Sequence, residues 1–394
     1  MPGTTATALG RRIETSRLAS GLTRCQLEEL SGVSYSTIRK VEGGERSPGD
    51  GIMEALARAL DRTPEDLLAG PGRTDSRVHE AIPNLQRAIA AYDLPEDGPV
   101  RSLPLLAADV GRAVEDRVQS RYAHLAEQMP QLLSELFRAV DKARGADREG
   151  AARLLALAIR SADAVAYKYG YGDLSGRLIE LMRWAASIAT DPALEAAAAY
   201  VRMETFFSVG QLGPGLRSLR TAVDRMPAPT TESLAAAAAA LHMRAAVAAG
   251  RMRRADEARE HLRDAEALAS RVRERLYDGT AVGPDSLEIH RLSVAVELGN
   301  PQDLRDAVVA AARWAPPRDL PAERRSHYYI DLGRAQMLLG QPQHAKESLL
   351  TARQIAPQHV REHGQVRTEL ATMVRLSRGR DEQLLAFARW AKAV

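Results

Sequence analysis

The stretch GLTRCQLEELSGVSYSTIRKVEGGERSP, from Gly21 to Pro48, decides the fold of the N-terminal part of this 394-residue chain. Thr23 and, three residues later, Gln26 form a Thr-x-x-Gln capping box, which predicts the start of a helix. Leu27 and Leu30 give that helix one apolar face. We therefore expect a short amphipathic helix that ends at the next glycine.

A tight turn and a second helix follow. Gly32 can adopt the left-handed backbone conformation that a sharp turn needs, and Val33 can be buried between the two helices. Ser34 is placed to cap a second helix, which the pattern predicts from Tyr35 to about Glu42 before two glycines end it. The inward residues of this helix are Ile38 and Val41, and its outward residues are Tyr35, Ser36, Arg39 and Lys40.

Further short helices are expected around this pair. One spans about Leu9 to Ser20, one starts at Ser47 and Pro48 with a cap and a first-turn proline, and one starts at Thr63 and Pro64. Two short helices joined by a glycine-containing turn of about four residues form a helix-turn-helix, whose second helix projects polar side chains into the major groove of DNA. Candidate core residues of this bundle are Ile13, Leu18, Leu27, Ile38, Val41, Ile52, Leu56, Ala59 and Leu60.

The stretch resembles the Cro/repressor, or XRE-type, family of DNA-binding domains over residues 9 to about 69. The pattern is specific because its apolar, turn and cap positions agree in register. These positions are Leu22, Thr23, Leu27, Ser31, Gly32, Val33, Ser34, Ile38, Glu42, Gly44 and Pro48. The resemblance implies that Tyr35, Ser36 and Lys40 read base edges, and that Arg17 and Glu42 form a structural ion pair.

The resemblance also predicts contacts with the DNA backbone. Arg24 stands where the family usually has a glutamine that touches phosphate, and arginine binds phosphate as well. A single module of this kind binds weakly, so we expect a homodimer on an inverted-repeat operator in double-stranded DNA, with half-sites about one helical turn apart. The residues expected at the DNA interface are Arg24, Ser34, Tyr35, Ser36, Thr37, Arg39, Lys40 and Arg46.

A linker separates this domain from the rest of the chain. Pro71 begins a polar segment, a helix is expected from about Pro83 to Tyr92, and DLPEDGPVRSLP, from Asp93 to Pro104, must be a connector because of its prolines. The expected domains are 1–70 for the helix-turn-helix domain, 71–104 for the linker helix and Pro-rich connector, and 105–394 for a helical sensor and dimerisation domain.

Composition narrows the class of protein. Hydrophobic residues make up 45% of the chain but aromatic residues only 4%, and long runs rich in alanine and leucine indicate an all-α fold. The single cysteine, Cys25, excludes an internal disulfide. No apolar run approaches the ~20 residues of a membrane span, and the N-terminus lacks the apolar core of a signal peptide. We therefore expect a cytoplasmic protein without membrane association.

Residues 105–394 contain a repeat in which a glycine precedes a proline by a constant interval. The pairs are Gly210 and Pro227, Gly299 and Pro316, and Gly340 and Pro357. Three further registers coincide between these units: Gly215, Leu304 and Ala345; Leu219, Val308 and Leu349; Ala222, Ala311 and Ala352. A turn glycine, small contact residues and a terminal proline are typical of a helical hairpin.

This repeat resembles the tetratricopeptide repeat, best over residues 326–359, with weaker units around 150–192 and 234–269. The last helices, 358–378 and 381–394, look like a capping unit. The resemblance implies an α-solenoid whose first helices line a concave groove that binds a peptide, a small molecule or a partner protein. The candidate ligand-binding residues are Tyr200, Met203, Phe207, His242, Arg291, Tyr328, Gln336, Glu362 and Arg367.

Two other motifs carry less weight. HVREH, residues 359–363, matches the H-x-x-E-H zinc motif, but two ligands do not make a site. YKYGYGDLSG, residues 167–176, concentrates tyrosines that either pack in a hairpin turn or form an aromatic pocket wall. We assign no catalytic residue, no metal ligand and no cofactor, and we expect that the protein is not an enzyme.

These features favour a one-component bacterial regulator, similar to those whose helical repeats bind signalling peptides. The expected function is sequence-specific transcription regulation by a homodimer controlled by a peptide or small molecule in the repeat groove. Such receptors commonly hold the peptide backbone with asparagines, and this chain has only Asn84 and Asn300, so a small-molecule or protein effector stays open. The alternative is a tetratricopeptide-type interaction scaffold with only weak DNA association, which would not distinguish an operator from random duplex.

Overall fold

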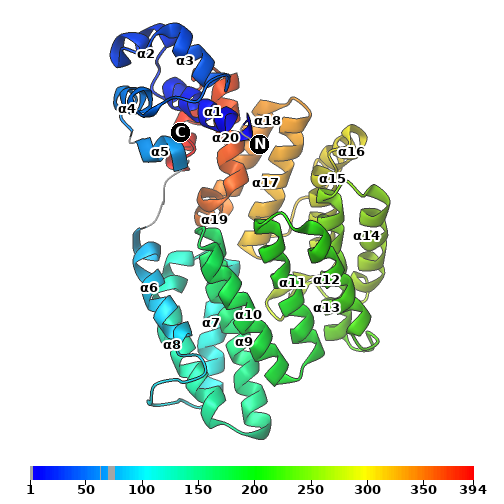
Figure 1. Ribbon diagram of the computed structural model, residues 1–394. Helices are drawn as coiled ribbons and strands as arrows, with labels where there is room; N and C mark the ends of the chain where they lie inside the picture. Colours follow the sequence, from blue (N-terminus) through cyan, green and yellow to red (C-terminus); the bar gives the residue numbers. More distant parts are fainter. Residues whose placement is uncertain (1–2, 63, 70–75) are drawn as a thin grey trace. The chain divides into compact units, whose positions relative to one another are not determined.

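A computed structural model of the chain describes residues 3–62, 64–69 and 76–394. The described residues are helical apart from turns and one two-stranded hairpin, which confirms the predicted all-α fold class (Figure 1). The chain forms two compact units. The terminal unit combines Met1–Thr74 with Val360–Val394, and the repeat unit is Asp75–His359.

The terminal unit is a bundle of short helices with its own core. Its helices are α1 (Gly3–Ala19), α2 (Arg24–Ser31), α3 (Tyr35–Glu42), α4 (Asp50–Ala59), α5 (Pro64–Ala69), α20 (Gly364–Leu376) and α21 (Glu382–Trp390). Helices α1 to α5 bury one cluster of apolar side chains, among them Ile13, Leu27, Ile38, Val41 and Leu56. The short helix α19 (Pro357–Glu362) lies at the boundary of the two units.

The predicted helix-turn-helix is present with its caps. The Thr23 hydroxyl accepts from the Gln26 backbone N–H, and the Gln26 side chain accepts from the Thr23 backbone N–H, as a capping box requires. Gly32 ends α2 with φ 69°, in the left-handed region. Ser34 caps α3 by accepting from the backbone N–H of Thr37. The bounds of α2 and α3 therefore agree with the prediction.

Other details of this bundle differ from the prediction. Leu30 is 62% exposed, because α2 buries only the stripe that contains Leu27. Helix α4 begins at Asp50, since the backbone stays extended through Gly49 and no side chain caps the helix at Ser47. Thr63, the expected cap of α5, lies outside the described residues.

The last helices of the chain pack on the first one. Helix α20 contacts α1. The Arg375 guanidinium donates from Nη1 to Thr15 Oγ1 at 2.9 Å, and Arg389 donates to the backbone carbonyl of Ala19. The sequence predicts these helices as a cap of the repeat, whereas the structure places residues 360–394 in the unit that holds the helix-turn-helix.

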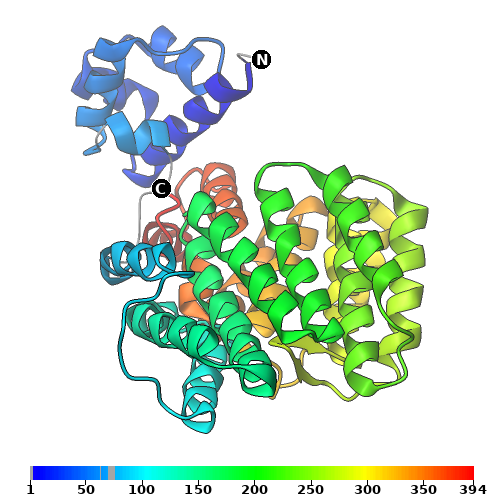
Figure 2. The ribbon, with the colours of Figure 1, turned by 60° about the horizontal axis from the view of Figure 1, so that its bottom comes forward.

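The repeat unit is a series of helices that pack side by side with their neighbours in the chain (Figures 1 and 2). Its helices are α6 (Ser76–Ala90), α7 (Leu103–Val118), α8 (Tyr122–Lys142), α9 (Gly145–Lys168), α10 (Gly172–Ala189), α11 (Pro192–Ser208), α12 (Leu212–Arg225), α13 (Glu232–Arg251), α14 (Ala255–Ala269), α15 (Pro284–Leu298), α16 (Pro301–Ala311), α17 (Ala322–Leu338) and α18 (Pro342–Ile355).

The repeated glycines and prolines mark helical pairs, as predicted. Gly210, Gly299 and Gly340 have φ between 62° and 74° and turn the chain after α11, α15 and α17. The first helices of successive pairs contact one another: α11 packs on α13, α13 on α15, and α15 on α17. Helix α17 also contacts α7, so this inner layer curves far enough to bring distant parts of the unit together. The arrangement is a tetratricopeptide-like solenoid.

Two features of the repeat unit correct the sequence prediction. Helix α6 begins at Ser76 and runs through Pro83, because its apolar stripe, which includes Val78 and Ile82, is buried in the core. Residues 275–282, expected to be helical, form the antiparallel strands β1 (Arg275–Tyr277) and β2 (Thr280–Val282). Asp278 and Gly279 both have positive φ in the turn, which suits a two-residue hairpin.

Helix α13 is longer and more apolar than the sequence prediction allowed for. Among the described residues it is the one helix whose length and composition would suffice to cross a membrane. Its alanines are buried on several faces against α11, α12, α14 and α15, so the helix is apolar all round because it lies inside the solenoid.

Candidate nucleic-acid interface

Helix α3 is oriented by the turn that precedes it. The Ser34 hydroxyl lies 3.0 Å from Thr37 Oγ1 and 3.3 Å from Ser36 Oγ, so these three hydroxyls cluster at the start of the helix. The backbone N–H of Tyr35 donates to the Glu28 carboxylate of α2 at 2.9 Å. The first turn of α3 is therefore fixed to α2 as well as to its own cap.

The two faces of α3 differ in burial. Ile38 and Val41 are at most 1% exposed and lock the helix onto the core. Tyr35 is 42% exposed, and the side chains of Ser36, Arg39 and Lys40 are exposed beside it. Side chains held on a fixed helix and open to solvent are what base readout in a major groove requires.

The basic residues near this face differ in whether they have an ion-pair partner. Arg39 lies 3.7 Å from the Glu45 carboxylate in an exposed ion pair, which contributes little to stability and can open. Neither Lys40 nor Arg46 has an ion-pair partner in the part of the chain that the structure describes, and both are exposed. These two side chains are therefore the cations of this face that are most available for contact with an anionic partner.

A buried ion-pair network ties α1, α2 and α3 together. Arg17 donates to both carboxylate oxygens of Glu42, with Nε to Oε1 at 2.7 Å and Nη2 to Oε2 at 3.2 Å. The Glu42 side chain is 1% exposed and that of Arg17 is 6% exposed. This confirms the structural pair that the family resemblance implied.

Arg24 is a third member of this network, which the sequence did not indicate. Its Nε lies 2.6 Å from Glu42 Oε2, and its Nη2 lies 3.4 Å from Glu14 Oε1. The hydrogen bond to Glu42 raises the pKa of Arg24. The side chain is still 33% exposed, so the guanidinium is oriented by the two carboxylates while part of its surface faces solvent.

A glycine lets α1 approach α3 closely. A Cβ atom on Gly10 would lie 2.2 Å from the backbone oxygen of Val41 and 2.7 Å from that of Glu42. Any larger residue would push the two helices apart and move the outward face of α3. Gly10 is a positioning residue for the interface that the sequence pattern did not single out.

Some of the candidate ligand-binding residues come together in the repeat unit. Tyr200 and Met203 of α11 are buried, at 2% and 1% exposure. The Arg244 guanidinium carbon lies 3.9 Å from the centroid of the Tyr200 ring and 5.8 Å from that of Phe207. Helix α11 thus presents two aromatic rings to one arginine of α13, a cation–π arrangement.

The next two candidates, His242 and Arg291, have partners of their own. His242 Nδ1 lies 3.1 Å from His261 Nδ1 and 3.5 Å from Asp264 Oδ2, and burial lowers the pKa of both histidines. Arg291 forms exposed ion pairs with Glu266 and Glu288.

The last four candidates serve packing or pairing. Tyr328 stacks edge-on against Trp314, and the Ser348 hydroxyl donates to Gln336 at 2.8 Å in the α17–α18 contact. Glu362 and Arg367 pair with each other at 2.9 Å in the terminal unit. The tyrosine-rich turn after α9 packs on α6, where Tyr171 Oη lies 2.7 Å from His79.

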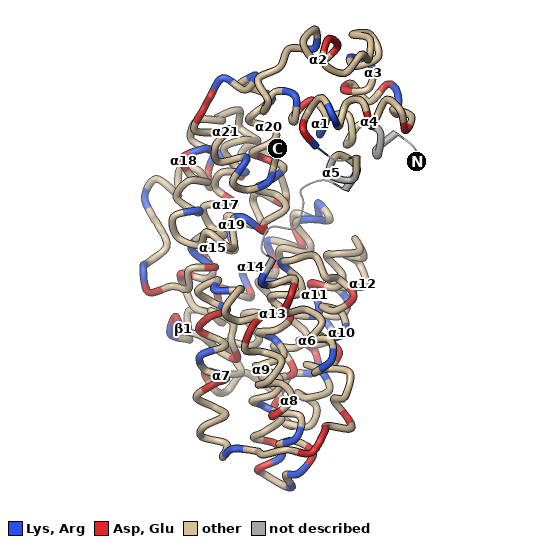
Figure 3. The backbone as a smooth tube through the Cα atoms, turned by 90° about the vertical axis from the view of Figure 1, so that its left-hand side faces the viewer, with Lys and Arg blue, Asp and Glu red and all other residues tan. Residues whose placement is uncertain are grey.

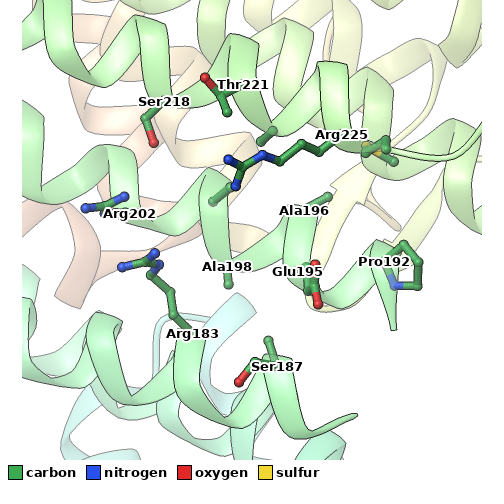
Figure 4. Close-up of a pocket in the computed structure, with 14 residues that line it drawn as sticks. Arg183, Ser187, Pro192, Glu195, Ala196, Ala198, Arg202, Ser218, Thr221 and Arg225 are labelled. Carbon is green, nitrogen blue, oxygen red and sulfur yellow. The ribbon is translucent and has the colours of Figure 1, made fainter. Parts of the chain in front are cut away.

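A surface pocket opens between α10, α11 and α12 (Figure 4). It has a volume of about 450 Å³, and Arg183, Arg202 and Arg225 extend into it from the three helices, near the hydroxyls of Ser218 and Thr221. Arg183 and Arg202 both lie close to the Glu180 carboxylate, at 2.6 and 3.6 Å. Basic and acidic residues alternate along the repeat unit rather than forming a face of one sign (Figure 3).

Comparison with known proteins places the N-terminal segment in a family. Residues 8–69 match the family described as helix-turn-helix domain. No curated protein matches the chain. Bacillus thuringiensis PlcR, solved in complex with the peptide PapR7 and DNA, is 15% identical, with a TM-score of 0.33 over 67% of this chain and 94% of that chain.

A second solved structure is the apo form of ComR from S. thermophilus. It is 12% identical, with a TM-score of 0.24 over 88% of this chain and 99% of that chain. The family match and the geometry of α2 and α3 agree on the same residues, and the N-terminal segment of this chain is a helix-turn-helix DNA-binding domain.

Proposed function

We propose that the protein is a sequence-specific transcription regulator that binds an inverted-repeat operator as a homodimer. The observation that carries this proposal is the two-faced helix α3, which is anchored by Ile38 and Val41 and offers Tyr35, Ser36 and Lys40 to solvent. A merely structural helix has no need for an exposed aromatic ring beside an unpaired lysine at its outward surface.

The expected roles follow the burial of each side chain. Tyr35, Ser36 and Lys40 read base edges, while Arg39 and Arg46 contact phosphates and fix the register of the helix on the duplex. Ser34 and Thr37 hold the first turn of α3 and approach the DNA backbone. Arg24 contacts phosphate with the part of its guanidinium that Glu42 and Glu14 leave exposed.

Regulation is assigned to the repeat unit. A curved stack of helical pairs changes curvature when a ligand favours one arrangement of the stack. An effector bound to the inner helices would shift the population of conformers and thereby the spacing of two helix-turn-helix domains in a dimer.

The test is selection of random genomic fragments by the purified full chain at near-physiological salt. The wild type should enrich an inverted repeat, and an Arg39→Ala/Lys40→Ala variant should not. The matched control is Arg58→Ala/Arg62→Ala, which removes the same number of exposed positive charges outside α2 and α3. Equal enrichment by the wild type and the α3 variant, or equal binding of operator and random duplex, would contradict the proposal and favour an interaction scaffold.

A further inference from the structure

Arginines from four helices of the repeat unit gather around one buried tyrosine. Arg117 comes from α7, Arg160 from α9, Arg244 from α13 and Arg324 from α17, and Tyr200 lies on α11. These helices are far apart in the sequence and belong to the layer that curves until α17 contacts α7. The fold therefore concentrates positive charge at one place inside the solenoid.

Tyr200 is contacted by three of these arginines. Arg324 donates from Nη2 to the Tyr200 hydroxyl at 3.0 Å. The guanidinium carbons of Arg244 and Arg160 lie 3.9 and 5.8 Å from the centroid of the ring. Burial alone would raise the pKa of Tyr200, but the charges of Arg244 and Arg324 outweigh burial and lower the pKa.

The β-hairpin holds the two deepest arginines in place. Arg160 donates from Nη1 to the backbone oxygen of Asp278 at 2.5 Å, and Arg117 donates from Nη2 to that of Gly279. A Cβ on Gly279 would lie 2.9 Å from Arg117 Nη2, so the glycine makes room for the guanidinium. These contacts orient the side chains through neutral carbonyls and leave their positive charge uncompensated.

Nearby carboxylates do not balance the charge. Glu204 lies 3.3 Å from Arg244, and Glu323 lies 4.0 Å from Arg117 but is also shared with Lys168 at 3.6 Å. Burial and the proximity of Glu204 raise the pKa of the neighbouring Asp163, whose Oδ1 accepts from the Ser175 hydroxyl at 2.6 Å. Even with Asp163 included, three acidic groups face four guanidiniums and one ammonium.

The excess positive charge is buried. Arg117 is 7% and Arg160 5% exposed. Within the described residues, the Nε atoms of Arg117 and Arg244 are buried without a hydrogen-bond partner. Burial and the proximity of Arg117 lower the pKa of Arg160 to about 9. Buried charges and donors are normally paired, because leaving them unpaired is unfavourable, so an anion bound among these arginines would be stabilised.

We infer that the arginine cluster is the effector site of this protein and binds a carboxylate or phosphate group of a small anionic molecule. Guanidinium groups hold both kinds of oxyanion with paired, charge-assisted hydrogen bonds. A partner protein is disfavoured because its surface cannot reach Arg117 and Arg160, which are 7% and 5% exposed. The inference rests on the proposed control by a ligand and names the chemical class of that ligand. An anion bound by these arginines would draw four helices of the curved layer together.

The test measures thermal unfolding of the full chain in rising concentrations of inorganic phosphate or succinate, with chloride adjusted to keep the ionic strength constant. The wild type should show a saturable rise in Tm of about 2–4 °C with at least one of the two anions. A response to phosphate alone identifies a phosphate ligand, and a response to succinate alone identifies a carboxylate ligand. An Arg160→Met variant should lose the rise.

The matched control is Arg153→Met. Arg153 lies on α9, like Arg160, and also holds the hairpin, but it is paired with Asp191 and Asp278. Its substitution should lower the starting Tm and preserve the anion-dependent rise. Arg160→Met should leave the starting Tm equal or higher, because it removes an uncompensated buried charge.

Two results would overturn the inference. One is a wild-type Tm that responds to neither anion. The other is a rise that persists in Arg160→Met but disappears in Arg225→Gln, which would place the anion in the surface pocket between α10, α11 and α12. Operator selection is measured separately. Specific DNA binding without an anion response would leave the DNA-binding proposal standing, and an anion response that never alters operator affinity would refute effector control instead.

Discussion

Two groups of buried arginines in this protein differ in how their charge is matched. In the terminal unit, Arg17 and Arg24 share Glu42, and Arg24 and Arg375 both approach Glu14, so each of these arginines has a carboxylate partner. In the repeat unit, four arginines and Lys168 face Glu204, Glu323 and Asp163, and Arg160 donates to the backbone oxygen of Asp278 instead of to a carboxylate. A matched network has its partners within the chain and serves structure. An unmatched one is complete only with a partner from outside.

The largest effect is expected from removing a negative charge from the matched network. Glu42→Gln leaves Arg17 buried without its counter-charge, and we expect the free energy of unfolding to fall by about 3–5 kcal/mol. Urea denaturation of the full chain measures the loss. Glu45→Gln is the control, because its pair with Arg39 is exposed and should contribute less than about 1 kcal/mol. Similar small losses in both variants would mean that the Glu42 network is not a structural element.

Substitutions outside the network should change DNA binding without changing folding. Tyr35→Ala and Lys40→Ala are each expected to reduce discrimination between operator and random duplex by about 1–3 kcal/mol, since each removes a base contact from an exposed position. Affinities for the two duplexes at one salt concentration measure the effect, and the unfolding transition should stay unchanged. Equal weakening on both duplexes would remove these residues from base readout.

The surroundings of the arginine cluster can also be tested through pH, because burial and the nearby Arg324 oppose protonation of His290. Burial, assisted by Arg324, lowers the pKa of His290 to about 3, while its Nδ1 lies 2.7 Å from the backbone oxygen of Ser286. In the unfolded chain this histidine binds a proton below about pH 6.5, whereas burial in the folded chain opposes that protonation. Through this histidine alone, stability should therefore fall as pH drops below about 6.5, by up to about 1.4 kcal/mol per pH unit.

The measurement for this prediction is urea unfolding between pH 7.5 and about 4.5. His290→Asn should flatten the dependence by the contribution of one proton. The exposed His344→Asn should leave the slope as in the wild type. A His290 variant with an unchanged slope would show that this histidine does not oppose protonation in the folded state.

The smallest effect is expected at the partly exposed member of the matched network. Arg24→Ala leaves Glu42 paired with Arg17, so the stability loss should stay near 1 kcal/mol. It should also weaken binding to operator and random duplex by the same factor, and the salt dependence of binding should become shallower by about one counterion. A change in base preference would assign Arg24 to readout instead of phosphate contact.

Local sequence signals predicted most of the helix-turn-helix and failed where packing overrode them. The capping box at Thr23, the turn at Gly32 and the cap at Ser34 are interactions between near neighbours in the chain, so their spacing identified α2 and α3. The sequence predicts a helix start at Pro83, yet α6 runs through this proline because a buried apolar stripe outweighs one lost hydrogen bond. The strands of the hairpin at Asp278 and Gly279 are too short to show a strand pattern, so the sequence of this segment did not predict the hairpin.

The sequence by itself determined the all-α fold class, the helix-turn-helix and the helical pairs, because caps, turn glycines and apolar periodicity act within a few residues. Only the tertiary structure decided the addition of Arg24 to the Glu42 pair, the packing of α20 on α1, and the gathering of four arginines around Tyr200. Those arginines are separated by up to 207 positions, and each looks like an ordinary helical arginine in the sequence. Their meaning depends on charge balance and burial, which exist only when distant helices share one interior.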